Sequence, residues 1–185
     1  MCIRDSCRTP HDAIVNGVVM VPEDRKLQGI IPRMSVGRNI SIGSLDQITN
    51  RLGFVNTRRE EQIGLEGKAN FNIKTPDLEK PIVELSGGNQ QKAIVARWMS
   101  TKPEVLILDE PTKGIDVGAK SEFYNMICEF AKEGLAVILI SSELPEVIGL
   151  SDRIIVMRGR RIVGEISAKD ATEEKLLSMA MMEEA

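Results

Sequence analysis

The chain has 185 residues, 42% of them hydrophobic, and a formal net charge of -3. This length suffices for one domain with a substantial core but not for two large ones, and the slightly acidic charge gives no electrostatic reason to expect nucleic acid as a partner. The apolar runs at 105–108 and 136–140 are far too short to cross a bilayer.

The first predicted element is a β-strand over Gly17 to Val21, an apolar and β-rich segment that Pro22 ends. A charged loop follows at Glu23 to Lys26. The next segment, Ser35 to about Lys80, has few β runs, scattered charge and apolar residues at mixed helical spacings. It predicts a helical subdomain that, together with the helix after it, covers about 35–100.

The segment Leu85 to Lys92 places two glycines, Gly87 and Gly88, and the hydroxyl of Ser86 at the start of a helix predicted over Asn89 to about Met99. Glycine lets the backbone come close to a ligand, Ser86 can cap the helix, and the exposed N–H groups with the helix dipole favour an anion. The pattern indicates either a phosphate site or an ordinary capped helix.

The apolar run Val105 to Leu108 predicts a buried parallel strand that is covered on both faces. Asp109 and Glu110 follow it, and ligands of open α/β sheets bind beyond the carboxyl ends of strands. Asp109 is therefore placed to hold Mg²⁺, and Glu110 to orient an attacking water. The alternative for an Asp-Glu pair in this position is a solvated turn.

The remaining segments continue an α/β alternation. A helix is predicted over Asp116 to Lys132, with its buried face on one side, and a parallel strand over Ala136 to Ile140. Two strands at 153–157 and 161–166 predict a hairpin around Gly159, and 171–182 predicts a final amphipathic helix.

These motifs resemble those of ABC-type ATPases: Leu85 to Lys92 is similar to their signature, Leu106 to Thr112 to their Walker B strand, and Gly114 to Asp116 to their D-loop. Together with 21–26 and 141–146, they resemble the second nucleotide-binding domain in the fused ATPase subunit of monosaccharide importers. The resemblance covers roughly 12–165. It implies a partial ABC nucleotide-binding domain at 11–185, preceded by an unmatched stretch at 1–10 that we interpret as a truncation or assembly scar.

The resemblance implies an α/β fold of the P-loop NTPase type, with a mostly parallel sheet and a helical subdomain, in an ATPase that binds ATP and Mg²⁺ and powers sugar import. The expected partners are the other nucleotide-binding domain of the same subunit, transmembrane permease subunits and, indirectly, a periplasmic sugar-binding protein, with no nucleic acid. The expected location is peripheral, at the cytoplasmic face of the inner membrane.

The resemblance also assigns roles to individual residues. Metal binding falls to Asp109 and catalysis to Glu110 with Asp109, while nucleotide contacts fall to a set from several motifs: Ser86, Gly87, Gly88 and Gln90 of the signature, Glu23 of the Q-loop, Asp116 of the D-loop, and Ser142. In ABC dimers the signature of one domain completes the ATP site of the other, so the signature residues of this chain are expected to serve a partner domain.

Three departures from the family pattern concern the chain's own ATP site. The phosphate loop G-x-x-x-x-G-K-[ST] of Walker A is absent, together with the strand that carries it. Glu23 occupies the Q-loop position of a Gln, and Ser142 that of a switch histidine, while the only histidine is His11. We therefore expect the chain alone to be inactive and its own site to be compromised.

Other functions compete with this one. The family resemblance is also compatible with the ATPase subunit of a nucleoside or other small-solute importer, or with a catalytically degenerate regulatory module. ATPase heads of DNA repair or chromosome maintenance carry a similar signature, but they need long heptad-bearing helices, and no sustained a/d pattern occurs in this sequence.

Overall fold

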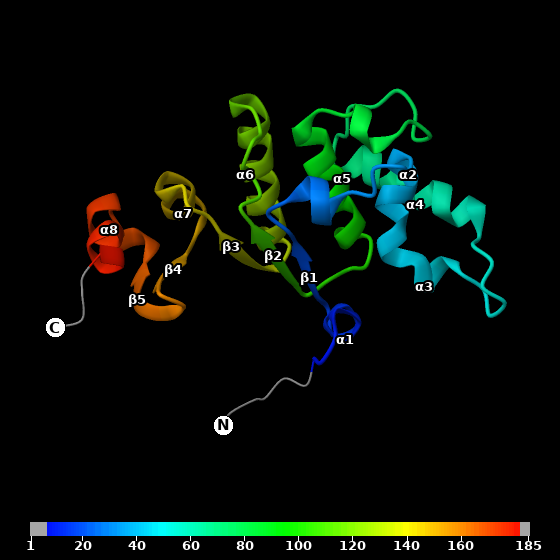
Figure 1. The fold of residues 1–185 in the computed structure, drawn as a ribbon. Helices are drawn as coiled ribbons and strands as arrows, with labels where there is room; N and C mark the ends of the chain where they lie inside the picture. Colours follow the sequence, from blue (N-terminus) through cyan, green and yellow to red (C-terminus); the bar gives the residue numbers. More distant parts are fainter. Residues whose placement is uncertain (1–6, 182–185) are drawn as a thin grey trace. The chain divides into compact units, whose positions relative to one another are not determined.

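The computed structural model describes residues 7–181, in two compact units that divide between Ile138 and Leu139. Part of the unmatched stretch 1–10 and the end of the last predicted helix lie outside the described residues. The elements before the division are α1 (Pro10–Val15), β1 (Val18–Val21), a π-helical turn η1 (Arg25–Gly29), α2 (Val36–Ser41), η2 (Ile42–Ser44), α3 (Leu45–Ile48), α4 (Thr57–Asn70), η3 (Ile82–Glu84), α5 (Gly87–Met99), β2 (Val105–Asp109) and α6 (Val117–Lys132), and the division crosses β3 (Ala136–Ile140). Figure 1 shows them in chain order.

The sheet of the first unit has the order β1-β2-β3, and β1 runs parallel to β2 with Val21 opposite Leu108. Alternate residues of β1 and β2, Val21 and Leu108 among them, are fully buried on the face against which α5 packs. The opposite face is only partly covered, because Met20 is 43% exposed and its neighbour Ile107 is half-buried. The prediction that both faces of β2 are covered is therefore confirmed for one face only.

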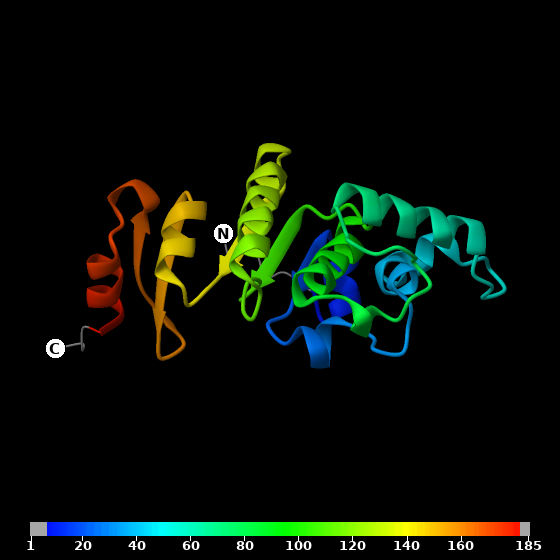
Figure 2. The ribbon, with the colours of Figure 1, turned by 90° about the horizontal axis from the view of Figure 1, so that it is seen from above.

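The predicted helical subdomain contains α2, α3 and α4, and it packs on α5 through close helix contacts (Figures 1 and 2). Gly67 of α4 makes this approach possible, since a Cβ there would lie 2.7 Å from Cγ2 of Ile40 on α2. The same Cβ would be 3.4 Å from Cβ of Ala96 on α5. Three helices therefore meet at a position where no larger side chain fits without movement.

A buried arginine joins α5 to the rest of the first unit. Arg97 is 7% exposed; its Nη1 donates to the carbonyl of Gly29 at 2.7 Å, its Nε to the carbonyl of Asn39 at 2.6 Å, and its Nη2 to Oδ1 of Asn39 at 3.0 Å. Burial lowers the pKa of Arg97 to about 10, so the guanidinium stays charged at neutral pH. These bonds fix the C-terminal half of α5 to η1 and α2.

The helix after β2 follows its sequence pattern. Phe123, Ile127 and Phe130 of α6 are buried on one face, at the spacing expected for an amphipathic helix. Asp116 caps the helix by accepting from the N–H of Ala119 at 3.0 Å. The predicted helix over 116–132 is thereby confirmed within one residue.

The second unit contains α7 (Leu144–Leu150), β4 (Arg153–Arg158), β5 (Arg161–Ser167), η4 (Ala168–Asp170) and α8 (Glu173–Met181). The antiparallel pairing of β4 with β5 confirms the predicted hairpin. The sequence pattern did not predict α7, because this helix is only 7 residues long. Its proline lies in the first turn, where the N–H that proline lacks would have no partner within the helix. No helix among residues 7–181 is long and apolar enough to span a membrane.

We expect the substitution Arg97→Met to destabilise the first unit by about 3 kcal/mol, because it leaves the buried carbonyls of Gly29 and Asn39 without a donor. The measurement is urea unfolding of the chain, with the exposed Arg58 changed to Met as the matched control, which should shift stability by less than about 0.5 kcal/mol. Equal effects of the two substitutions would contradict the role of Arg97.

Candidate functional site

The signature turn, which we define as Ser86 to Gly88, forms the N-terminal end of α5. The helix begins at Gly87, two residues earlier than predicted. Ser86 occupies the position before it, yet its hydroxyl does not accept from the first-turn N–H groups; it accepts from Nδ2 of Asn89 at 2.9 Å. Oδ1 of Asn89 in turn accepts from the N–H of Lys74 at 2.8 Å. The side chain of Ser86 therefore does not cap the N-terminus of α5.

Both glycines of the signature turn lie in close contact with other segments. A Cβ at Gly87 would be 2.6 Å from Nη2 of Arg25, and a Cβ at Gly88 would be 2.9 Å from Cβ of Ala119 on α6. The second contact involves a side chain held by its own helix, which cannot move easily. Glycine is therefore required at position 88 for the packing of α5 on α6, whereas a side chain at position 87 would require the guanidinium of Arg25 to shift.

A polar cavity of about 290 Å³ lies beside the signature turn, between α5 and the start of α6. Its wall includes Ser86, Asp116 and the ion pair between Lys92 and Glu122. The side chain of Lys92 is only 8% exposed, and its hydrogen bond and charge lower the pKa of Glu122. The ammonium groups of Lys74 and Lys92 in its lining are balanced by the carboxylates of Asp116 and Glu122, so any preference for an anion rests on the N–H groups at the start of α5.

The fourth signature residue points elsewhere. Gln90 is 7% exposed, and its Nε2 donates to the carbonyls of Ile82 at 3.3 Å and Leu85 at 3.1 Å. These bonds fix the segment that leads into the signature turn. Gln90 is thus placed to support the turn, and its contact with nucleotide stays a prediction.

The carboxylates of the predicted metal site lie at the carboxyl ends of β1 and β2. Because Val21 pairs with Leu108, the strand register brings Glu23 to the same edge as Asp109 and Glu110. Burial raises the pKa of Asp109, and the negative charges of Glu23 and Glu110 raise it further, while Lys113 lowers it. Like charges crowded at one edge are an arrangement that a bound cation relieves.

The backbone of this edge is strained at one residue. Glu110 has φ +45°, in the left-handed region that non-glycine residues rarely adopt. Such conformations persist only where the surroundings enforce them, and they cluster at functional sites. Asn72, Lys102 and Arg160 also have positive φ, so this conformation is compatible with a site residue but does not distinguish it from a turn, and the role of Glu110 stays a prediction.

Glu23, at the Q-loop position, forms an ion pair with Lys113 at 2.5 Å. The same contact raises the pKa of Lys113. The lysine balances part of the negative charge that Glu23 contributes to this edge. The role of Glu23 at the metal therefore stays a prediction, while its contact with Lys113 is an observed link between two loops.

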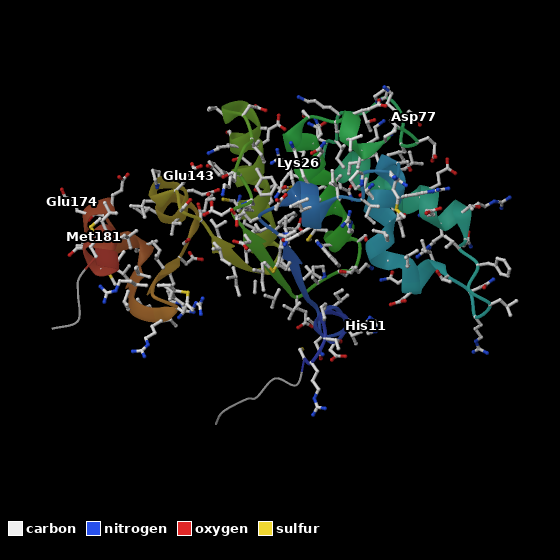
Figure 3. The ribbon with its side chains drawn as sticks, viewed as in Figure 1. His11, Lys26, Asp77, Glu143, Glu174 and Met181 are labelled. Atoms are coloured by element: carbon white, nitrogen blue, oxygen red, sulfur yellow. The ribbon has the colours of Figure 1, made fainter. Side chains whose placement is uncertain are left out.

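Ser142 lies in the second unit and is exposed. Its neighbour Ser141 makes the local contacts there, accepting from the N–H of Glu143 at 3.0 Å and donating to Glu146. His11, the only histidine of the chain, is exposed on α1 (Figure 3).

The residues at the end of β2 fit Mg²⁺ in chemistry and charge. Among residues 7–181 no three His, Cys, Asp or Glu side chains are arranged to hold a metal ion by themselves. Mg²⁺ commonly takes one or two carboxylates and completes its octahedron with phosphate and water. Asp109 therefore suits a magnesium ion that arrives together with a nucleotide.

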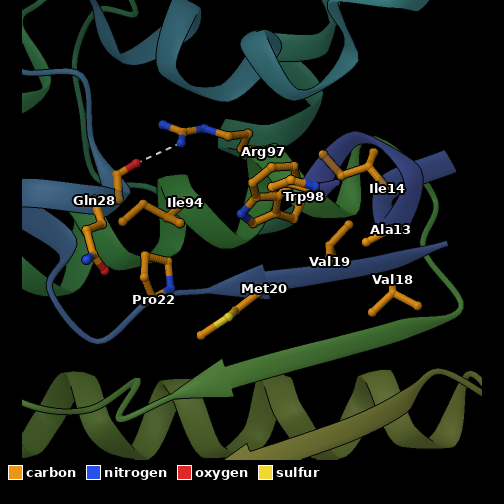
Figure 4. A pocket seen from close by; sticks show the side chains of 12 residues that line it. Ala13, Ile14, Val18, Val19, Met20, Pro22, Gln28, Ile94, Arg97 and Trp98 are labelled. Carbon is orange, nitrogen blue, oxygen red and sulfur yellow. Dashed lines mark hydrogen bonds between the residues drawn. The ribbon is translucent and has the colours of Figure 1, made fainter. Parts of the chain in front are cut away.

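A second cavity, of about 530 Å³, is apolar and lies between α1, β1 and α5. Trp98, Ile94 and Met20 line it (Figure 4). Trp98 therefore packs among apolar side chains. Its Nε1 is buried and has no hydrogen-bond partner among the described residues.

Sequence reasoning missed the residues that connect the motifs. Arg25 reaches the carbonyls of Lys113 and Gly114, which lie 88 and 89 positions further along the chain. The Lys92–Glu122 pair joins α5 to α6 across 30 positions. The charge of these side chains was visible in the sequence, but no local spacing indicates partners at such separations.

Comparisons with known proteins agree with this architecture. An arabinose import ATP-binding protein of Mannheimia succiniciproducens is 54% identical over 96% of this chain and 36% of its own length. A ribose import ATP-binding protein of Rhodopirellula baltica is 49% identical over 94% of this chain and 34% of its own length. The chain thus spans about a third of the length of the curated relatives it matches.

Solved structures show the same fold. An ATP-binding cassette of an ABC transporter superposes with a TM-score of 0.74 at 21% identity, covering 93% of this chain and 71% of that one. A dimeric ATP-binding cassette in a post-hydrolysis state, bound to ADP and Pi, gives a TM-score of 0.69 at 18% identity over 85% of this chain and 66% of that one. The expected α/β cassette fold is confirmed. The family model for ABC transporter matches residues 4–113, and this chain belongs to that family.

Proposed function

We propose that this chain is part of the ATP-hydrolysing subunit of a sugar importer, and that its signature turn completes an ATP site held mainly by another nucleotide-binding domain. Relatives at 47–54% identity are named as import proteins for arabinose, ribose or galactose, which supports a sugar as the transported solute. In this proposal the subunit works with transmembrane permease subunits, and through them with a periplasmic sugar-binding protein. It sits peripherally at the cytoplasmic face of the inner membrane.

The observation that carries the proposal is the geometry of the signature turn. Its serine leaves the first-turn N–H groups of α5 uncapped, and a polar cavity opens beside it. An α-helix N-terminus of this kind favours a phosphate through its N–H groups and its dipole. A terminal phosphate presented by a neighbouring domain would meet Ser86 and the two glycines there.

The carboxylates at the end of β2 belong to the chain's own site in this proposal. Mg²⁺, when bound with ATP, neutralises charge developing on the transferred phosphate. Asp109 would be its protein ligand, and Glu110 would orient the attacking water. Asp116, which caps α6, would hold the D-loop in place at the domain interface.

Two observations support unequal sites. Glu23 is occupied by its ion pair with Lys113, and Ser142 supplies a hydroxyl where an imidazole would take up or share a proton. The main catalytic contribution of this chain is therefore the signature turn offered to the partner, and its own carboxylates contribute less.

The substitution Ser86→Arg tests the first half of this proposal. In the transporter subunit that carries this domain we expect kcat for ATP hydrolysis to fall by roughly a hundredfold or more. The arginine removes the serine hydroxyl, and its bulk keeps the phosphate away from the N–H groups of the signature turn. Steady-state ATPase assays measure it. The control is Ser178→Arg, an exposed serine of α8, which should leave turnover unchanged.

The substitution Glu110→Gln tests the second half. It removes the carboxylate that would orient water while keeping its size, so we expect turnover to fall by about twofold at most, since the partner's site still works. The same ATPase assay measures it. Abolished turnover in Glu110→Gln with intact turnover in Ser86→Arg would reverse the assignment of the two sites.

A further inference from the structure

The loop after β1 is fastened to the loop after β2 by two neighbouring side chains. Arg25 donates from Nη1 to the carbonyl of Lys113 at 2.9 Å and from Nη2 to the carbonyl of Gly114 at 3.2 Å. Glu23 binds the ammonium of Lys113 at 2.5 Å. The planar guanidinium thus spans two successive carbonyls, a geometry that a lysine ammonium cannot reproduce.

The same guanidinium also lies against the signature turn. A Cβ added to Gly87 would be 2.6 Å from Nη2 and 3.1 Å from Cζ of Arg25, and 3.4 Å from the carbonyl oxygen of Gly114. Gly114 itself lies close by, since a Cβ there would be 3.7 Å from Nη2 of Arg25. Three segments that are distant in the sequence therefore meet at one side chain.

Hydrogen bonds hold the backbone of η1, which carries Arg25, at both ends. Oδ1 of Asp24 accepts from the N–H groups of Lys26 and Leu27, each at 3.0 Å, which fixes the start of η1. At the other end of η1, the carbonyl of Gly29 accepts from the buried Arg97 of α5. Hydrogen bonds therefore connect η1 to α5 at one end, through Gly29, and to the carbonyls of Lys113 and Gly114 at the other, through Arg25.

We propose that Arg25 is a positioning residue that keeps the signature turn and the loop at 113–116 in a fixed relation to the segment 23–29. The guanidinium of Arg25 binds the carbonyls of Lys113 and Gly114 and packs against Gly87. A movement of η1 therefore shifts the loop at 113–116 and the signature turn together. The catalytic consequence rests on the proposed function of the signature turn, whereas the mechanical link does not.

Amide hydrogen exchange on the chain without nucleotide tests the mechanical link. In Arg25→Gln we expect faster exchange at residues 113–119 and at 87–90, because the loop loses the donors that hold its carbonyls. Protection in α2 and α4 should stay as in the unchanged chain, which shows that the fold is intact. The matched control is Arg161→Gln, an exposed arginine of β5, which should change exchange in neither segment.

ATP hydrolysis by the transporter subunit tests the consequence. We expect Arg25→Gln to lower kcat by about tenfold to a hundredfold with KM for ATP nearly unchanged, because the nucleotide is held mainly by the partner domain while the signature turn is displaced. Arg25→Lys, which keeps the charge but not the fork, should lose nearly as much. Added guanidinium ion should restore part of the turnover of Arg25→Ala but none of that of Ser86→Arg.

The outcomes distinguish the mechanical link at Arg25 from the proposed function of the signature turn. Unchanged exchange at 113–119 and 87–90 in Arg25→Gln would overturn the link, whatever the ATPase rates show. Full activity in Arg25→Lys, when Ser86→Arg is inactive, would overturn the catalytic consequence, because a point charge at residue 25 would then suffice. Intact turnover in Ser86→Arg would refute the proposed function, while faster exchange in Arg25→Gln would still support the mechanical link.

Discussion

The absence of side chains at Gly87 and Gly88 is the constraint on which the arrangement of this domain depends. It allows the first turn of α5 to approach Arg25 on one side and Ala119 of α6 on the other, at distances where a Cβ would clash. The contact at Gly88 is with Cβ of Ala119, which cannot move without its helix, whereas a Cβ at Gly87 would require the guanidinium of Arg25 to shift. A backbone that comes so close to its neighbours also presents its N–H groups without a side chain in the way.

The helix that begins at this turn is anchored at both ends by buried polar side chains. Gln90 fixes the approach to the turn, and Arg97 fixes the far half of the helix to η1 and α2. Buried polar groups with full sets of partners are rigid, because breaking any one bond leaves an unsatisfied group in a low dielectric. The signature turn is therefore presented by a helix with little freedom to move independently.

The sequence predicted the parts of the fold that follow from local pattern. The strands β1, β2 and β3, the β4–β5 hairpin and α6 appear close to where apolar periodicity and turn residues placed them. Periodicity could not reveal α1 or η1, which are shorter than two full helical repeats, nor the exposure of Met20, which depends on what covers the sheet. The fold class was predictable because the motifs occur in a fixed order along the chain.

The sequence singled out the candidate site residues, whose roles stay predictions, but it did not reveal the contacts that connect them. Asp109, Glu110 and the signature turn were evident from spacing, whereas the hydroxyl of Ser86 binds Asn89 instead of capping α5. Arg25 lies in the segment 21–26 and Lys113 between the Walker B and D-loop segments, yet their bonds join parts of the chain that only folding brings together. Tertiary contacts of this kind carry no local signature, since the partner lies beyond any window of the sequence.

Photocleavage by trapped vanadate shows whether the signature turn contacts the terminal phosphate of ATP. Vanadate trapped with ADP and Mg²⁺ occupies the position of the terminal phosphate, and ultraviolet light then cuts the backbone of residues that touch it. In the transporter subunit that carries this domain, we expect cleavage within Ser86 to Gly88. Efficient trapping with cleavage elsewhere and none at these residues would contradict it.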